Sequence, residues 1–276
     1  MALKSLSSGA HPAATFPNSH LLRPNSPVLS ASKSPGAVQG VGGGAWAAPQ
    51  TGTALTELRE AVRDEDWAKN YAECLTKLHM RSEWSASDER CNLLKWLASS
   101  ICAQRALEVG SFCGVGTLAL AEAMPAADAQ VLALELDPFV VNLGKRFQMK
   151  AACSHKIQHL VGPAKTSLEH LAAEAHAGRL QPFDIVLVDA DKESLGEYFD
   201  LVWNSPGLLT KSAVVCIDMT PFKGQPPLRF VRFGFPYQCE THSGQEEIDA
   251  LRASVKSSSS FSSHESGGLL IVQRAT

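Results

Sequence analysis

The sequence predicts an α/β protein whose mostly parallel sheet carries helices on both faces. From residue 105 onward, short apolar runs alternate with segments of helical periodicity, which is typical of a parallel sheet. A glycine-rich turn at residues 110–116 separates the first apolar run from a helix. Acidic residues stand at the ends of three further runs, where ligands bind in open α/β sheets.

Residues 1–56 differ in composition from the rest of the chain. They contain no acidic residue, three basic residues, and many serine, alanine, proline and glycine residues. Such a segment cannot bury enough apolar surface to fold, and acid-poor, serine-rich N-termini are also typical of organelle transit peptides. We therefore expect a disordered tail or a transit peptide over 1–56, chloroplast rather than mitochondrial because arginine is scarce, and one folded domain over 57–276.

The charge balance excludes several classes of partner. The net charge is −3, and without the three basic residues of the tail it is about −6, from 22 basic and 28 acidic residues. No Lys/Arg cluster predicts nucleic-acid binding, and no apolar stretch approaches the ~18 residues needed to cross a bilayer. We expect a small-molecule ligand and no membrane contact, with a homodimer left open.

The seven cysteines are scattered and include no Cys-x-x-Cys pair. This pattern argues against a disulfide framework or a zinc site and favours a reducing compartment. We expect a cytoplasmic or plastid protein that is not secreted.

The elements follow from the periodicity of apolar residues. Helical spacing predicts helices over 57–77 and 88–102 that cover one edge of the sheet. The expected strands are 106–109, 131–135, 157–161, 183–188, 213–217 and 269–272. Helices are expected over 117–124, from Asp137-Pro138 onward, from a capping box at Thr166–Glu169, and over 193–203 and 245–255. Residues 230–237 form a β-like aromatic stretch, and the serine-rich residues 257–263 are expected to be a connection.

The glycine turn predicts a nucleotide-like cofactor, because exposed backbone N–H groups meet there at a helix N-terminus. Gly110, Gly114 and Gly116 do not follow the Gly-x-Gly-x-x-Gly spacing of dinucleotide sites, which disfavours an NAD-linked oxidoreductase. Glu108 precedes the first glycine by two residues. Glu135 follows Gly110 by 25 residues at the tip of the next strand, where an acid can accept hydrogen bonds from ribose hydroxyls.

A second group of polar residues ends the fourth and fifth expected strands. Asp189 and Asp218 should be neighbours, and two carboxylates with no adjacent arginine repel unless they share a proton or a cation. Their oxygens suit Mg²⁺, although strand-end acids also cap loops. Lys192, three residues after Asp189, is a candidate general base, and a solvated lysine beside Glu193 is the alternative.

These motifs together resemble those of the cation-dependent O-methyltransferases that use S-adenosylmethionine, the caffeoyl-CoA and catechol O-methyltransferase group. The resemblance covers residues 57–276. Its motifs are Ala106-Leu-Glu-Val-Gly-Ser-Phe-Cys-Gly-Val-Gly-Thr117, Leu134-Glu-Leu-Asp-Pro138, His155-Lys-Ile157, Gly162-Pro-Ala164, Val188-Asp-Ala-Asp-Lys192, Val215-Cys-Ile-Asp218 and Gly267-Gly-Leu-Leu-Ile-Val-Gln-Arg274.

The resemblance implies a Rossmann-like, seven-stranded fold of the class I methyltransferase type and a role for each matching residue. It implies a methionine-end site made by Glu108, Gly110, Ser111, Gly114 and Gly116. It also implies Glu135 at the ribose, Pro163 and Ala164 at the adenine, and Asp191 near the cofactor. Asp189 and Asp218 would bind the divalent cation, most simply Mg²⁺, and Lys192 would be the base, with Asp189 the second catalytic residue.

Three departures from the family pattern limit what is carried over. Met219 stands where the family has a third metal ligand, an asparagine, and a thioether is a poor ligand for Mg²⁺. Gly114-Val-Gly116 replaces Gly-Tyr-Ser, and Asp88-Glu-Arg-Cys-Asn92 replaces the Asp-Glu-Gly-Gln segment. The prediction is an O-methyltransferase for a small hydroxylated aromatic acceptor, assisted by a cation. The alternatives are a metal-independent methyltransferase and a non-catalytic S-adenosylmethionine-binding protein.

Overall fold

The computed structural model describes residues 53–221 and 244–275. The strands are β1 (Arg105–Val109), β2 (Gln130–Glu135), β3 (Ile157–Val161), β4 (Phe183–Val188), β5 (Leu209–Asp218), β6 (Phe261–Ser266) and β7 (Leu269–Arg274). The α-helices are α1 (Thr53–Asp64), α2 (Trp67–Ala72), α3 (Asp88–Ser100), α4 (Val115–Ala123), α5 (Pro138–Gln148), α6 (Ala164–His176), α7 (Leu195–Asn204) and α9 (Gln245–Ser257). Two 3₁₀ turns, η2 (Ser82–Trp84) and η3 (Ser154–Lys156), complete the described elements.

The strands form one seven-stranded sheet in the order β3-β2-β1-β4-β5-β7-β6. β1 to β5 are parallel, whereas β7 runs antiparallel to both β5 and β6. The predicted fold class is therefore confirmed. The strand order reverses between β1 and β4, and ligands of open α/β sheets bind beyond the carboxyl ends of the strands at such a switch point.

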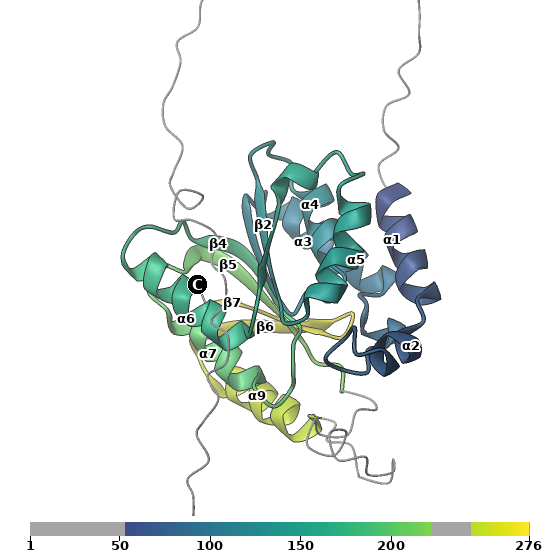
Figure 1. Cartoon of the computed structure of the whole chain (residues 1–276). Helices are drawn as coiled ribbons and strands as arrows, with labels where there is room; N and C mark the ends of the chain where they lie inside the picture. Colours follow the sequence, from purple (N-terminus) through teal and green to yellow (C-terminus); the bar gives the residue numbers. More distant parts are fainter. Residues whose placement is uncertain (1–52, 222–243, 276) are drawn as a thin grey trace, which may run out of the picture.

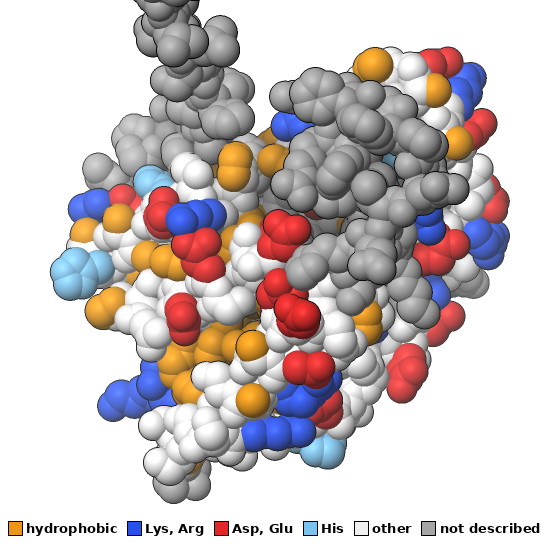
Figure 2. Space-filling model, turned by 90° about the horizontal axis from the view of Figure 1, so that it is seen from below, with side chains coloured by type: hydrophobic (Ala, Val, Ile, Leu, Met, Phe, Trp, Pro, Cys, Tyr) orange, Lys and Arg blue, Asp and Glu red, His pale blue; other side chains and the backbone are white. Residues whose placement is uncertain are grey.

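Helices cover both faces of the sheet (Figure 1). α6, α7 and α9 pack on one face, in a core that includes Phe183, Val186 and Ile217. α3 and α4 pack on the other face against Ile185 and Leu187, and α1 and α5 form a further layer against α4. No helix in the two described ranges is long and apolar enough to cross a bilayer. On the described part of the face in Figure 2, basic side chains lie among acidic ones.

The helical region before β1 differs from its prediction. The expected helix over 57–77 is two helices, because the chain breaks after Asp64 and Asp66 begins α2 by accepting a hydrogen bond from the Lys69 N–H at 3.0 Å. α1 begins at Thr53, and Leu55 is buried. The domain boundary predicted at residue 56 therefore falls inside a packed helix.

Two further predictions fail for local reasons. α6 begins at Ala164 with Pro163 as its N-cap, so Thr166 lies inside the helix and forms no capping box. The last residues of the serine-rich connection, 261–263, begin the edge strand β6, whose residues after Phe261 are all exposed. An edge strand of that kind has no apolar face to reveal it in the sequence. The expected aromatic stretch at 230–237 lies outside the described residues.

Candidate functional site

The glycine turn connects β1 to α4 at the switch point of the sheet. The Gly110 and Ser111 N–H groups both donate to the Leu134 carbonyl at 3.0 Å, which ties the turn to β2. Gly110 has φ +84°, and a Cβ there would lie 2.2 Å from the Asp189 carbonyl oxygen at the end of β4. Only glycine allows this conformation and this close approach. The turn therefore lies directly beside the strand-end acid of β4.

The turn leads into the N-terminus of α4, which is suited to binding a polar ligand. Gly114 begins the helix in the left-handed conformation, with φ 76°, and the first N–H groups of a helix lack partners within it. The Ser111 hydroxyl is buried and has no hydrogen-bond partner among the described residues. A buried hydroxyl without a partner is costly, so a ligand that hydrogen-bonds to it would be favoured here.

Glu108 is buried within β1, with 3% of its surface exposed. It accepts a hydrogen bond from the Thr117 hydroxyl. A Cβ on Gly116 would lie 2.3 Å from Glu108 Oε1, so the glycine leaves the space that the carboxyl group occupies. Burial raises the pKa of Glu108 to about 8. A cationic ligand group near this carboxyl would favour its ionised form.

Glu135 ends β2 beside the same turn. Its carboxylate accepts the Phe112 N–H at 2.7 Å and the Asp137 N–H at 3.0 Å. Burial raises its pKa, although these backbone hydrogen bonds act in the opposite direction. Two carboxylate oxygens offer about four acceptor sites, so Glu135 can hold the turn and still accept hydrogen bonds from ligand hydroxyls.

The other residues predicted for the cofactor have mixed surroundings. Pro163 is exposed and Ala164 half-buried at the start of α6, after the end of β3. Asp191 is exposed, and its carboxylate accepts the Ser194 N–H at 3.1 Å and the Tyr198 hydroxyl at 2.6 Å. Asp191 therefore organises the start of α7 in this structure.

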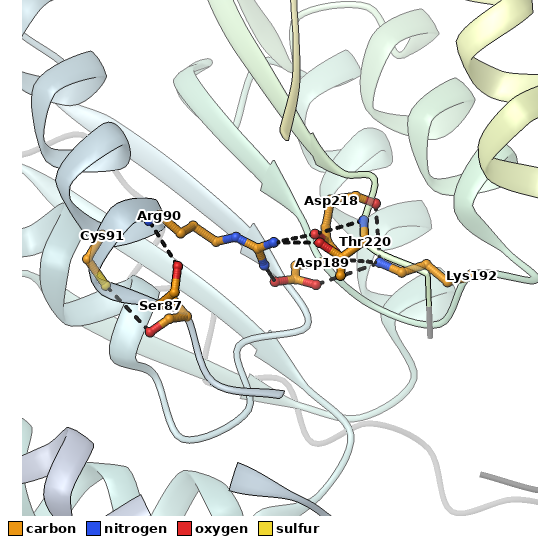
Figure 3. A network of polar contacts seen from close by, with 8 residues as sticks. Ser87, Arg90, Cys91, Asp189, Lys192, Asp218 and Thr220 are labelled. Atoms are coloured by element: carbon orange, nitrogen blue, oxygen red, sulfur yellow. Dashed lines mark hydrogen bonds and ion pairs between the residues drawn. The ribbon is translucent and has the colours of Figure 1, made fainter. Parts of the chain in front are cut away.

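Arg90 stands between the two strand-end carboxylates of β4 and β5 (Figure 3). One guanidinium nitrogen, Nη1, donates to Asp189 Oδ2 at 2.7 Å, and the other, Nη2, forms an ion pair with Asp218 Oδ1. Nη2 also lies 3.1 Å from Thr220 Oγ1. The premise that no arginine is adjacent to these carboxylates is therefore wrong. Arg90 comes from α3, 99 residues before Asp189 in the chain.

Lys192 completes the cluster from the opposite side. Its ammonium donates to Asp218 Oδ2 at 2.5 Å and to the Asp218 carbonyl at 3.2 Å, and it lies 3.8 Å from Asp189 Oδ1. Lys192 is buried, with 6% of its surface exposed. In this arrangement Lys192 is a hydrogen-bond donor to Asp218 rather than a proton acceptor. The prediction that it is the general base has no support from this geometry.

The residues present do not fit a divalent cation. All four oxygens of the Asp189 and Asp218 carboxylates face a guanidinium or an ammonium nitrogen. The cluster contains two positive and two negative side chains, so it offers a divalent ion no net electrostatic attraction. Met219 is buried in the core beneath the sheet end. Among the described residues, no group of three or more His, Cys, Asp or Glu side chains could hold a metal ion.

Arg90 was missed by sequence reasoning, although a signal was present. It lies within Asp88-Glu-Arg-Cys-Asn92, the segment that departs from the resembling family's pattern. Its N–H donates to the Ser87 hydroxyl that caps α3, at 3.2 Å. Pairing Arg90 with Asp189 and Asp218 from the sequence would have required the position of α3 relative to the sheet.

Known proteins resemble this chain in sequence. A family model described as O-methyltransferase matches residues 59–226. Tricin synthase 1 of Oryza sativa subsp. japonica is 35% identical over 150 residues, which cover 52% of this chain and 59% of that protein. Catechol O-methyltransferase domain-containing protein 1 of Mus musculus is 39% identical over 112 residues, 41% of each chain. The chain spans about half the length of the curated relatives it matches.

Solved structures with the same fold include two O-methyltransferases. TomG from Streptomyces achromogenes, solved with S-adenosylmethionine, superposes with a TM-score of 0.58 at 20% identity and covers 81% of this chain and 90% of its own. The Bacillus cereus O-methyltransferase gives a TM-score of 0.58 at 18% identity, with 81% and 91% covered. At these identities the likeness establishes the arrangement of the sheet and its helices.

Proposed function

Because this chain belongs to the O-methyltransferase family, we propose that it moves the methyl group of S-adenosylmethionine to a hydroxyl of a small aromatic acceptor. The observation that carries the proposal is the glycine turn at 110–116. It joins a helix N-terminus, the Ser111 hydroxyl that has no partner among the described residues, the buried Glu108 carboxyl and the half-buried Glu135 carboxyl at the switch point of the sheet.

Each part of the turn matches a part of S-adenosylmethionine. Glu108 would accept the ammonium group, and Gly110, Ser111, Gly114 and Gly116 would surround the methionine end. Glu135 would hold the ribose hydroxyls. Pro163 and Ala164 would border the adenine, and Asp191, before the start of α7, would lie near the cofactor. This set is supported by the partners of Glu108 and Glu135, which within the described residues accept hydrogen bonds from one hydroxyl and two backbone N–H groups and from no cation.

The acceptor would lie over the ends of β4 and β5. Bound S-adenosylmethionine supplies a methyl carbon on a positively charged sulfur, so an acceptor oxygen that bonds to it leaves the carbon–sulfur electron pair on sulfur. The chain's task is to orient that oxygen and receive its proton. Asp189 is the carboxylate placed for this, because 22% of its side chain is exposed, against 5% for Asp218 and for Lys192.

The predicted cation is not part of this proposal, because the strand-end cluster does not fit one. A metal-independent transfer, kept as an alternative in the sequence analysis, is therefore the form we adopt. A metal-independent transfer requires that the positively charged side chains of the cluster, Arg90 and Lys192, orient the acceptor.

The test begins with calorimetry of S-adenosylmethionine binding to the full chain. Glu135→Ala is expected to weaken binding by roughly 10- to 100-fold, because it removes an acceptor of two ribose hydroxyls. Glu174→Ala is the matched control, since Glu174 pairs with Arg179 near the far end of α6. Equal affinity of the wild type and Glu135→Ala would contradict the assigned cofactor site.

A transfer assay with methyl-labelled cofactor and a panel of phenols then tests the activity. Binding followed by labelled product supports the proposal. Binding with no product on any phenol would favour the non-catalytic binding protein. Binding of NAD with no binding of S-adenosylmethionine would instead support an NAD-linked oxidoreductase.

A further inference from the structure

The position of Arg90 is determined by a well-packed helix. Ser87 caps α3, and the neighbours of Arg90 on that helix, Cys91 and Leu94, are buried. From this anchored backbone the side chain extends to the ends of β4 and β5, where 12% of it remains exposed (Figure 3). The packing of α3 therefore holds the guanidinium in the site.

The guanidinium makes the contacts that a bound ion would otherwise make. It bridges one oxygen of Asp189 and one oxygen of Asp218, and it also contacts the Thr220 hydroxyl. Lys192 engages the remaining oxygen of each carboxylate. An ion could reach the two carboxylates only by displacing Arg90, and the displaced guanidinium would lose partners that its partial burial makes necessary.

We propose that Arg90 is the resident cation of this site, takes the place of a divalent metal between Asp189 and Asp218, and binds the acceptor oxygen directly. The acceptor part of this inference rests on the proposed function; the exclusion of metal does not. Arginine has five N–H donors, and three are engaged by Asp189, Asp218 and Thr220. The other two, on Nε and Nη1, have no partner among the described residues.

This replacement predicts a different acceptor class. A metal ion selects two vicinal hydroxyls because it can coordinate both oxygens. The two available donors of Arg90, Nε–H and one Nη1–H, lie on different edges of the planar guanidinium, so each can donate to one oxygen and a single hydroxyl is sufficient for binding. The acceptor is then a phenol that needs no neighbouring hydroxyl, and its proton passes to Asp189 while the oxygen–methyl bond forms.

Titration with Mn²⁺, followed by electron paramagnetic resonance, tests the exclusion of metal without any need for activity. The wild-type chain is expected to bind no stoichiometric Mn²⁺. Arg90→Ala combined with Met219→Asn removes the resident cation and supplies an oxygen ligand, and it is expected to bind Mn²⁺ at least ~10-fold more tightly than the wild type.

Two further variants make the result decisive. Arg252 also bridges two carboxylates, Asp249 and Glu265, but on the surface, so Arg252→Ala is expected to gain no Mn²⁺ binding. Arg90→Lys keeps a positive charge and is also expected to exclude Mn²⁺, which keeps the test valid if the double variant does not fold. One Mn²⁺ bound per wild-type chain, or no difference between wild type and a folded double variant, overturns the proposal.

The acceptor is tested by kcat/KM for a monophenol and its matched catechol, each with Mg²⁺ or with EDTA. Wild type is expected to show values within ~10-fold of each other and no loss in EDTA. A catechol preference above ~100-fold that disappears in EDTA overturns the inference. Such a result would leave the proposed methyl transfer intact, whereas absence of S-adenosylmethionine binding would fail the proposed function alone and leave the Mn²⁺ result standing.

Discussion

The carboxyl groups at the two ends of the site have different kinds of hydrogen-bond partner. At the ends of β1 and β2, the buried Glu108 and the half-buried Glu135 accept hydrogen bonds from neutral donors, a hydroxyl and two backbone N–H groups. At the ends of β4 and β5, Asp189 and Asp218 are paired with Arg90 and Lys192. The first pair therefore remains available to a cationic ligand, whereas the second is already neutralised by the chain itself.

The pKa shifts of Glu108 and Asp218 follow this difference. Burial raises the pKa of Glu108 to about 8. Burial also acts to raise the pKa of Asp218, but Lys192 and Arg90 outweigh it and hold that pKa below its usual value. A carboxyl group whose pKa is raised in the folded state stabilises the protein less as pH rises. A carboxyl group whose pKa is lowered in the folded state stabilises the protein less as pH falls. Glu108 and Asp218 should therefore respond to pH with opposite signs, whereas Asp189, whose pKa is raised by burial to about 6, should respond with the same sign as Glu108.

The largest effect is expected where the neutralised pair is broken. Asp218→Ala leaves Lys192 and Arg90 without their shared partner in a buried position, and we expect the free energy of unfolding to fall by about 4 kcal/mol. Urea denaturation followed by circular dichroism measures it. A loss below about 1 kcal/mol would mean that the cluster is solvated rather than buried.

The next effect is the pH dependence of the other end. Glu108 has an ordinary pKa of 4.5 that rises to about 8 in the folded chain, so the folded state binds more protons between these values. The free energy of unfolding of the cofactor-free wild type, relative to Glu108→Gln, should therefore fall by about 3 kcal/mol from pH 5 to pH 8. Denaturation at several pH values checks it, and parallel curves for the two proteins would contradict it.

A smaller effect concerns the space beside Glu108. A Cβ at position 116 would lie 2.3 Å from Glu108 Oε1, so Gly116→Ala should destabilise the chain by about 1–2 kcal/mol. The carboxyl group causes the conflict, and a double-mutant cycle with Glu108→Ala should therefore recover about 1 kcal/mol. Additive losses in the cycle would show that the helix, and not Glu108, opposes the larger residue.

The smallest effect is expected at an arginine that resembles Arg90 only in its pairing. Arg252 bridges Asp249 and Glu265 with 27% of its side chain exposed, and both partners are more exposed still. Arg252→Ala should change the free energy of unfolding by less than about 1 kcal/mol, and by less again in high salt. A loss as large as that of Asp218→Ala would remove burial as the reason for the contrast.

The sequence alone was sufficient for most of the sheet and for the position of the glycine turn. Strands 157–161 and 183–188 were predicted at their observed bounds. The second of them is almost fully buried, and buried parallel strands are near-continuous apolar runs. The glycine turn and its flanking acids are local as well, since Glu108, Gly110 and Ser111 belong to one strand and the turn after it. Edge strand β6 was missed because its exposed, polar residues carry no apolar pattern.

Only the tertiary structure decided what stands between the acids of β4 and β5. Asp189 and Asp218 could be placed side by side from strand order, but their partner is 99 and 128 residues away on a helix that precedes the sheet. Neither periodicity nor spacing states how α3 crosses the strand ends, because that depends on how its buried side pairs with the sheet. The choice between a bound metal and a built-in guanidinium is therefore made by packing, whereas the place of the glycine turn follows from local sequence.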